Sequence, residues 1–300
     1  MVHCIGEILL DMFGEAKGHS LELSSKLGGA PFNVAANVAA QGGNASFYGV
    51  LGNDSFGDFA AKEASFYPLK RLVLDRTSKA NTTLAVVTLD KGERSFRFLR
   101  SPGADYLLDE NRLPALGVKK GDIVHFGSLM LSKEEGRAFL KRAIDYFREV
   151  CAFVSFDANL RLDIFQSEEE AKTIYDEIFP LVDILKLSED ELAFFFGKDD
   201  PASFEKEKMK GVSLLFASYG EKGSACYAPP FSCFVPSVPV KPIDTTGAGD
   251  AFYARVLLGL DKVADPFALD IDECKAILDV ANKEGAKAVY HFGALPVLTC

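Results

Sequence analysis

The feature that most constrains the fold is an alternation of short apolar segments and helical patterns beyond residue 120. Apolar runs, each too short for a helix, lie at 123–126, 153–156, 184–187 and 214–217. Between them lie helical patterns at 133–149, 167–179 and 189–196. Uninterrupted apolar strands of this kind are typical of a parallel sheet that is buried on both faces. We therefore expect an α/β fold, with helices on both sides of a mostly parallel sheet.

The rest of the chain adds strands near the start and helices near the end. Strands are expected at 2–10, 21–27 and 45–51, and helices at 33–41 and 55–65. Three strand-like pieces with no room for a helix between them lie at 72–74, 83–89 and 95–99. We expect these three to form an antiparallel group apart from the main sheet. A β meander at 224–238 and helices at 248–260 and 271–290 complete a single domain, 1–300, with a small β appendage.

Composition limits the functions open to the chain. It has 33 Lys and Arg against 43 Asp and Glu, a formal net charge of −10. This balance argues against extended binding to nucleic acid or to an anionic membrane, because both need clustered basic residues. With no apolar run of about 18 residues and no signal-peptide pattern, we expect a cytoplasmic protein. The six cysteines are scattered and favour reduced thiols, and His and Cys lack zinc spacing.

The most informative motif is Asp-Thr-Thr-Gly-Ala-Gly-Asp at 244–250, directly before an apolar helix. Small residues at a helix N-terminus let a ligand approach backbone N–H groups, and the helix dipole favours an anion there. An aspartate would repel a phosphate, so Asp250 makes sense as a base for a hydroxyl that attacks a phosphoryl group. The alternative is a plain helix cap with turn glycines.

A second motif, Gly-Gly-Ala-Pro-Phe-Asn at 28–33, joins a strand to a helix. Its glycines permit close approach of a ligand, and Asn33 can donate and accept hydrogen bonds, which suits a polyhydroxylated molecule. A tight structural turn is an equal alternative. In the turn at 52–57 we expect Ser55 to cap the next helix and Asp54 to be structural.

Together these motifs resemble the ribokinase-like (PfkB-type) carbohydrate kinases, whose N-terminal and C-terminal signatures look like 28–43 and 244–250. The resemblance covers essentially the whole chain. It implies a three-layer α/β sandwich with a small β-sheet lid over the sugar. The lid is expected from two separate segments, about 10–27 and about 70–104.

The resemblance also implies roles for individual residues at the sugar. Asp250 would be the catalytic base, and the backbone of Gly247, Ala248 and Gly249 would stabilise the transferring phosphoryl group. The residues that match positions holding sugar hydroxyls are Asp11, Gly28, Gly29 and Asn33.

ATP and Mg²⁺ are the implied cofactors. Glu191 would orient Mg²⁺ through water, in a segment where Ser188 stands for the family's usual Asn. The residues that match nucleotide-binding positions are Lys186, Ser218, Gly220, Gly223 and Asn282. Asp244 and Thr246, with 292–297, match a segment that can bind a monovalent cation. Val297 lacks a hydroxyl there, which argues against dependence on K⁺.

Two segments bear on the sugar, 100–108 and 157–162, and both are most similar to bacterial fructokinases. The rival is 2-keto-3-deoxygluconate kinase, which also carries an Arg in each segment, where paired guanidinium groups would suit a carboxylate. In a fructokinase, Arg161 would face the ATP phosphates and Arg100 would span the lid or bind sugar hydroxyls. The alternative for Arg100 and for Arg161 is a structural role, an ion pair with a surface carboxylate.

Other functions are compatible with the same motifs. Another sugar or nucleoside kinase of the family is one, and a catalytically silent sugar-binding regulator is a non-enzyme alternative. Intact Asp250 and 247–249 argue against the regulator. The exposed edges of a lid sheet favour a homodimer formed through the lid. The family resemblance implies small-molecule partners only, with no nucleic acid and no membrane.

Overall fold

A nine-stranded sheet forms the centre of the computed structural model, which describes residues 1–90, 93–197, 211–229 and 231–297. Its strand order is β13-β12-β11-β10-β9-β8-β1-β4-β5. The strands are β1 (Val2–Ile5), β4 (Ala45–Gly52), β5 (Arg71–Thr77), β8 (Ile123–Phe126), β9 (Phe153–Asp157), β10 (Ile184–Ser188), β11 (Leu214–Ser218), β12 (Gly223–Ala228) and β13 (Phe231–Pro236). Neighbours from β11 to β5 run parallel, and β12 and β13 are antiparallel. The expected mostly parallel sheet is confirmed.

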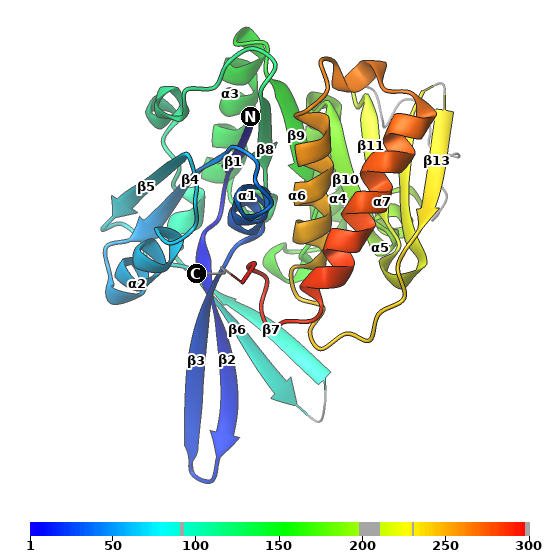
Figure 1. Cartoon of the computed structure of the whole chain (residues 1–300). Coiled ribbons are helices and arrows are strands. Elements are labelled where there is room, and N and C mark those ends of the chain that lie inside the picture. Colours follow the sequence, from blue (N-terminus) through cyan, green and yellow to red (C-terminus); the bar gives the residue numbers. More distant parts are fainter. Residues whose placement is uncertain (91–92, 198–210, 230, 298–300) are drawn as a thin grey trace.

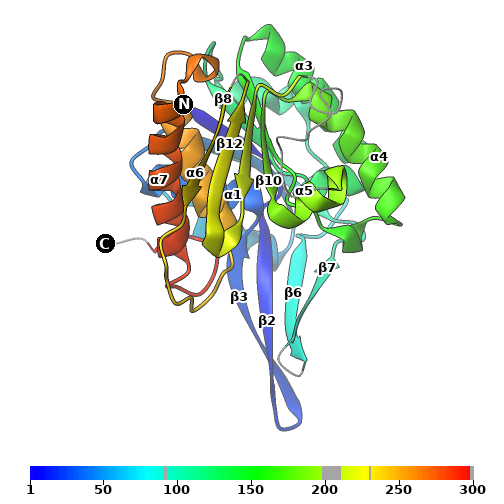
Figure 2. The ribbon, with the colours of Figure 1, turned by 90° about the vertical axis from the view of Figure 1, so that its right-hand side faces the viewer.

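Helices cover both faces of this sheet, as Figure 2 shows in a view along its edge. They are α1 (Ala30–Ala40), α2 (Ser55–Ala64), α3 (Glu134–Glu149), α4 (Glu168–Ile178), α5 (Glu189–Phe196), α6 (Ala248–Leu260) and α7 (Ile271–Ala288). Short 3-10 turns lie at Ala104–Tyr106, Glu110–Leu116, Leu129–Ser132, Leu162–Ile164, Phe179–Leu181, Gly220–Lys222 and Pro266–Ala268. The helices α1, α6 and α7 pack on one face, and α3, α4 and α5 on the other.

Alternate residues of each central strand serve the two cores. In β10, Ile184 belongs to the core under α6, whereas Leu185 and Leu187 belong to the core under α3 and α4. Because successive strand side chains point to opposite faces, a strand buried on both faces must be apolar throughout. This explains the uninterrupted apolar runs of the sequence and confirms the three-layer arrangement.

A second, four-stranded sheet projects from the main body, at the bottom of Figure 1. It consists of β2 (Leu9–Lys17), β3 (Ser20–Gly28), β6 (Leu84–Asp90) and β7 (Glu93–Leu99), in the order β3-β2-β6-β7. β2 pairs with β3 and β6 with β7 in antiparallel fashion, and β2 joins β6 in parallel. The expected small separate sheet is therefore present.

Two strand expectations are wrong. The segment 2–10 is divided between β1 and β2, which lie in different sheets. The break falls at Gly6, whose φ of +148° and close approach to Pro31 few other residues allow. The piece 72–74 lies in β5 of the large sheet, parallel to β4, and not in the antiparallel group. The reason is α2, which supplies the crossover that a parallel β4–β5 connection needs.

The cap expected at Ser55 is also wrong, because Asp54 is the N-cap of α2. Its carboxylate accepts a hydrogen bond from the backbone of Gly57 at 2.8 Å. It also accepts bonds from the backbone and the hydroxyl of Thr82, both at 2.8 Å. Asp54 therefore fixes the segment between β5 and β6 against α2.

Within the described part of the chain, no helix has the length and apolarity needed to cross a membrane.

Candidate active site

The turn before α6 has room for no side chain at position 247. Gly247 caps the helix with a φ of +76°, and a Cβ there would lie 2.4 Å from the Cα of Ala294. Asp244 fixes the turn, since one carboxylate oxygen accepts bonds from the backbone and hydroxyl of Thr246 at 3.0 and 2.7 Å. Its other oxygen accepts from the backbone of Gly293 at 3.0 Å. The first turn of α6 thus presents N–H groups and the positive end of a helix dipole.

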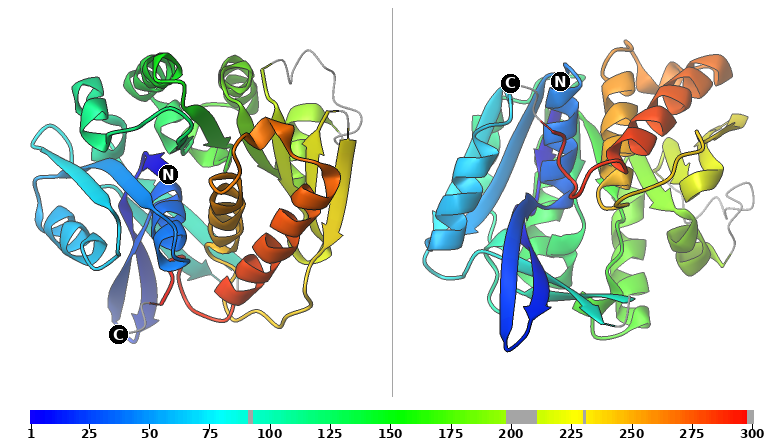
Figure 3. Two further views of the ribbon diagram at one scale, coloured as in Figure 1. Left: turned by 45° about the horizontal axis from the view of Figure 1, so that its top comes forward. Right: turned by 60° about the horizontal axis from the view of Figure 1, so that its bottom comes forward.

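The C-terminal segment after α7 forms part of this turn's support. In the right-hand view of Figure 3 it runs, in red, from α7 towards the blue strands of the small sheet. There Lys26 of β3 donates a hydrogen bond to the carbonyl of Phe292 at 2.8 Å. The segment therefore links the small sheet to the glycine turn before α6.

Asp250 lies in the first turn of α6, and Asn33 of α1 holds its carboxylate. The amide of Asn33 donates to Asp250 Oδ2 at 2.8 Å. Burial raises the pKa of Asp250, against the lowering effects of the Asn33 hydrogen bond and of the Lys186 and Arg161 charges. A carboxylate with a raised pKa and a fixed orientation is a suitable acceptor for a proton.

A cavity of about 420 Å³ opens in front of Asp250. The predicted sugar-site residues in its wall are Asp11, Gly29, Asn33 and Arg161. Ala85 and Phe98 contribute from the small sheet, so this sheet closes one side. Gly28 lies just behind, where a Cβ would be 2.4 Å from Asp11 Oδ2. Burial and the charge of Asp250 raise the pKa of Asp11 to about 7, although Arg161 opposes this.

A second cavity, of about 770 Å³, lies on the other side of the α6 N-terminus. All the predicted nucleotide residues except Lys186 line it, namely Ser218, Gly220, Gly223 and Asn282. Apolar residues from 238–242, α6 and α7 complete its wall. The two cavities share Thr245 and Gly249, so molecules in the two cavities would meet at the glycine turn.

Asn282 holds α7 against the hairpin of β12 and β13. Its amide oxygen accepts from the Ser224 hydroxyl at 2.7 Å, and its nitrogen donates to the carbonyl of Val235 at 3.0 Å. At Gly223, with φ +133°, a Cβ would lie 2.2 Å from that same carbonyl. The predicted nucleotide residues therefore also shape the cavity wall.

Lys186 places a buried ammonium beside the same turn. Its Nζ lies 3.0 Å from Asp157 Oδ1, and a Cβ at Gly249 would lie 3.6 Å from it. Burial lowers the pKa of Lys186, but the carboxylates of Asp157 and Glu191 outweigh this, so the net shift is upward. Lys186 is therefore a permanent positive charge next to the α6 N-terminus, and it lines the first cavity.

Glu191 joins two loops at the carboxyl edge of the large sheet. One oxygen accepts from the backbone of Leu160 at 2.6 Å and the other from the backbone of Ser188 at 2.6 Å. Each oxygen keeps a lone pair for a water molecule. The nearby Asp157 Oδ2 is buried without a hydrogen-bond partner in the described structure. Carboxylate oxygens are what a hard divalent cation prefers, but neither residue lines either cavity, and the described part of the chain contains no group of three acidic, His or Cys side chains that could hold a metal ion directly.

The structure separates the two predicted arginines. Arg161 is exposed and lines the first cavity. Arg100 is only 6% exposed, does not line this cavity, and binds the carboxylate of Asp105 through Nε and Nη2. Its guanidinium also stacks 5.2 Å from the centre of the Tyr106 ring. Arg100 is thus committed to a buried ion pair.

Sequence reasoning missed two kinds of cavity residue. Glu7, between β1 and β2, lines the first cavity although its neighbours are apolar. A lone acid inside an apolar run was the available signal. Ser128 and Asn159 also line this cavity, from loops that follow β8 and β9. Both lie at the carboxyl edge of the sheet; Asn159 falls within the segment 157–162 that bears on the sugar, although no role was predicted for it, and Ser128 belongs to no motif.

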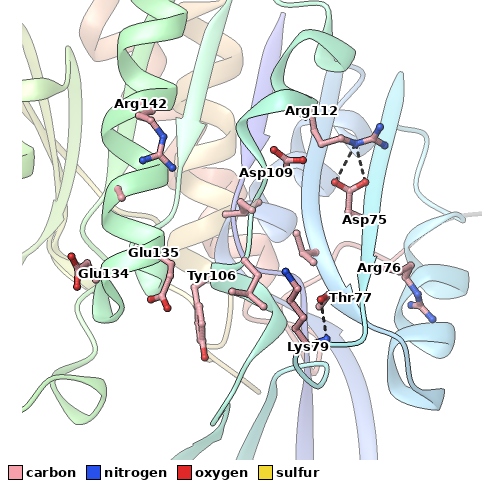
Figure 4. Close-up of a pocket in the computed structure, with 14 residues that line it drawn as sticks. Asp75, Arg76, Thr77, Lys79, Tyr106, Asp109, Arg112, Glu134, Glu135 and Arg142 are labelled. Atoms are coloured by element: carbon pink, nitrogen blue, oxygen red, sulfur yellow. Dashed lines mark hydrogen bonds and ion pairs between the residues drawn. The ribbon is translucent and has the colours of Figure 1, made fainter.

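A larger cavity, of about 1010 Å³, lies away from these residues, between β5 and α3 (Figure 4). Its wall mixes acidic and basic side chains. Arg112 pairs there with Asp75 at 2.9 Å, and Arg76 and Arg142 pair with acids outside it. This near-neutral wall selects no particular ligand charge.

The chain is similar to known carbohydrate kinases over nearly its whole length. A model of the pfkB family carbohydrate kinases matches residues 1–297. Probable fructokinase-7 of Arabidopsis thaliana is 37% identical, over 99% of this chain and 89% of that protein. Fructokinase with bound ATP from Xylella fastidiosa is 30% identical with a TM-score of 0.87, covering 98% of this chain and 93% of that one.

Fructokinase from Vibrio cholerae O395 is a third relative, at 30% identity and a TM-score of 0.82 over 98% of this chain. The match covers 94% of the form solved with fructose, ADP and calcium ion. It covers 93% of a double mutant solved with fructose, ADP and potassium ion.

Proposed function

The chain belongs to the pfkB family of carbohydrate kinases, and on that premise we propose that it transfers the γ-phosphoryl group of ATP to the 6-hydroxyl of fructose. It is an ATP-dependent sugar kinase that uses a nucleotide and a divalent metal. The acceptor sugar and the roles of individual residues are the proposal.

The observation that carries the proposal is the meeting of two cavities at the α6 N-terminus, beside Asp250. Sugar in the smaller cavity and ATP in the larger one would bring the hydroxyl and the γ-phosphate together there. Phosphoryl transfer asks a protein mainly for such alignment and for charge neutralisation.

The step is then a direct displacement. The Asp250 carboxylate accepts the proton of the sugar hydroxyl as its oxygen bonds to the γ-phosphorus. The bond between that phosphorus and the β–γ bridging oxygen breaks, and ADP leaves. Backbone N–H groups of 247–249 and the ammonium of Lys186 stabilise the charge on the transferring group. Asn33 keeps the Asp250 carboxylate in position.

We assign the divalent ion as Mg²⁺, which would neutralise the ATP phosphates when bound. Glu191 would hold it through water, with Asp157 as a second oxygen donor nearby. Asp244 and Thr246 form the candidate site for a monovalent cation. Replacing K⁺ by Na⁺ in the assay tests this, and Val297 favours a small effect.

The separation of the two arginines favours a neutral sugar over a keto acid. The paired arginines that a substrate carboxylate would need are not both present, because Asp105 neutralises Arg100. The carboxyl groups of Glu7, Asp11 and Asp250 line the same cavity. Lys186 and Arg161 line the cavity as well, so a substrate carboxylate would find one guanidinium there and not the expected pair, whereas sugar hydroxyls can hydrogen-bond to the carboxyl groups in either protonation state.

The test is ADP release with ATP, Mg²⁺ and a panel of fructose, ribose, nucleosides, tagatose and 2-keto-3-deoxygluconate. We expect turnover with fructose, and a product that phosphoglucose isomerase converts to glucose 6-phosphate. Turnover with the keto acid alone would replace the proposed substrate. Release at background with every sugar would favour a silent regulator.

We further propose a cytoplasmic homodimer formed through the small sheet. Leu21 and Leu23 of its edge strand β3 are 61% and 52% exposed, and residues two apart share one face. Covering such an edge protects it from unwanted pairing. A monomeric mass by light scattering would contradict the dimer, and cell fractionation tests the location.

A further inference from the structure

Glu7 is a carboxyl group buried in the wall of the sugar cavity. The residue is only 4% exposed, yet it lines that cavity beside Asp11 and Asn33. Its Oε2 atom is buried and has no hydrogen-bond partner among the described residues. A buried acceptor without a partner costs free energy, so the arrangement needs an explanation.

The backbone around Glu7 is shaped to hold its carboxyl group there. A Cβ at Gly127 would lie 2.9 Å from Glu7 Oε2, so a larger residue in the loop after β8 would displace the carboxyl. The preceding Gly6 adopts φ +148° over Pro31, which turns the chain between the two sheets at this point. Three separate segments thus leave room for one acidic side chain.

A structural ion pair does not account for Glu7. The cation whose charge acts on Glu7 is Arg100, whose Nε and Nη2 already bind Asp105 and whose Nη1 binds the Ser132 hydroxyl. Burial raises the pKa of Glu7 to about 8, to which the charges of Asp105 and Asp250 add and which Arg100 opposes. At neutral pH the group is therefore mainly a protonated acid, which can donate one hydrogen bond and accept others.

A second oxygen atom in the same wall also lacks a hydrogen-bond partner among the described residues. Asn33 Oδ1 is also buried without a partner, while the amide nitrogen of Asn33 holds Asp250. A sugar offers hydroxyls, each of which donates once and accepts twice. Two unpartnered oxygens on one wall therefore indicate a ligand with several hydroxyl groups.

We propose that Glu7 is a specificity-determining residue that hydrogen-bonds a hydroxyl of the sugar other than the one that is phosphorylated. The inference rests on the proposed function, in which this cavity holds fructose. It assigns Glu7 to substrate selection, whereas Asp250 acts on the reacting hydroxyl.

The test compares fructose with analogues that each lack one hydroxyl, such as 1-deoxyfructose, 2,5-anhydromannitol and 3-deoxyfructose. In wild type, the analogue that lacks the Glu7 partner should lose roughly tenfold to a hundredfold in kcat/KM. Glu7→Met keeps an unbranched side chain without hydrogen bonds. It should lower kcat/KM for fructose by a similar factor, while the KM for ATP changes little. The difference in kcat/KM between fructose and the analogue that lacks the Glu7 partner should disappear.

Thr83→Val is the matched control. Thr83 is buried, donates to Asp105 in the neighbouring cluster, and does not line the cavity. Thr83→Val should lower the free energy of unfolding. The relative kcat/KM values for fructose and its analogues should stay as in wild type. The inference is overturned if Glu7→Met keeps the wild-type pattern or if no analogue's penalty depends on residue 7.

A measurement on wild type covers the case in which Glu7→Met does not fold. With ¹³C-labelled glutamate, the carboxyl resonance of Glu7 is assigned by its absence in Glu7→Gln. Fructose should shift it along a saturating curve whose midpoint is the sugar's own Kd, and an unmoved resonance would overturn the inference. Turnover of fructose by wild type is measured first. If fructose is not phosphorylated, the proposed substrate is contradicted, but the role of Glu7 is not. The same series is then made for the sugar that is turned over.

Discussion

The buried pair of Arg100 and Asp105 should be among the most sensitive electrostatic sites in the fold. Asp105 is 1% exposed and Arg100 is 6% exposed. Asp105 also accepts a hydrogen bond from the Thr83 hydroxyl. The change Asp105→Asn keeps the shape of the side chain and removes its charge. It leaves a guanidinium with no counter-ion in a site that water hardly reaches.

The expected cost follows from the burial of both partners. Breaking a buried ion pair by removing one partner costs about 3–5 kcal/mol, mainly because the other charge stays buried. Unfolding entropy near the midpoint is roughly 2.1 cal/mol/K per residue, or about 0.63 kcal/mol/K for a chain of 300 residues. Dividing the cost by this entropy predicts a fall in Tm of about 5–8 °C.

The assay is thermal and urea unfolding of wild type, Asp105→Asn, Arg100→Met and the double variant. The double variant buries no lone charge, so its loss should be smaller than the sum of the two single losses. Additive losses, or a fall in Tm below about 2 °C for Asp105→Asn, would refute the account of Arg100 as a committed structural cation. That result would also reopen the keto acid as substrate.

Three further predictions concern the turn before α6 and the buried titrating groups. Gly247→Ala places a Cβ 2.4 Å from the Cα of Ala294, at a φ of +76°. It should lower kcat by about 10²–10³, as loss of an oxyanion-type donor does; steady-state rates within threefold of wild type would contradict this. Because burial raises the pKa of Asp250, the acid limb of kcat/KM should lie above the ordinary aspartate value of 3.8, and a profile flat down to about pH 4 would contradict it. Burial lowers the pKa of His125 from 6.5 to about 3. As pH falls below 6.5, the unfolded chain therefore binds a proton at His125 that the folded protein does not bind, and the free energy of unfolding should fall. In wild type, His125 is hydrogen-bonded to Ser155. Between about pH 7 and about pH 4.5, the free energy of unfolding in urea should fall less in His125→Gln than in wild type. An equal fall would contradict the lowered pKa of His125.

The strands of the large sheet were predictable because their environment is uniform. Residues 184–187 are apolar since both faces of β10 are buried, and the expected strand matches Ile184–Ser188 almost to the residue. The same uniformity hides where the chain changes sheets. Apart from His3 and Glu7, residues 2–10 are apolar on both sides of Gly6, and the chain changes sheets there through the backbone conformation of Gly6.

Which sheet a strand joins depends on contacts that lie far apart in the sequence. The piece 72–74 has ordinary strand character, which says nothing of its partner. It pairs with β4 because α2 returns the chain in the parallel direction. The small sheet in turn combines β2 and β6, whose partnership no local pattern encodes.

Motifs predicted the candidate site where several residues share one turn. Residues 244–250 and 28–33 each lie in a continuous segment, and the structure brings both to one cavity. Arg100 and Glu7 show the limit of this reasoning. Whether Arg100 reaches the cavity depends on Asp105, and whether the Glu7 carboxyl fits into the cavity wall depends on the room left by Gly127.

The residue after β9 joins this strand to β10. Ala158 donates from its backbone N–H to the carbonyl of Lys186 at 3.2 Å. The alanine therefore adds a bond between the end of β9 and β10, beside the lysine that approaches the glycine turn.

The central claim is that Asp250 is the base for phosphoryl transfer to the sugar, and Asp250→Asn tests it most directly. Turnover with fructose should fall by about 10²–10⁴, the usual contribution of a general base, while calorimetric binding of sugar and nucleotide stays within a few-fold of wild type. Asp54→Asn is the matched control, since this carboxylate caps α2 and lines neither cavity. Its turnover should stay near wild type. If Asp250→Asn keeps turnover within threefold of wild type, the assignment of Asp250 is contradicted.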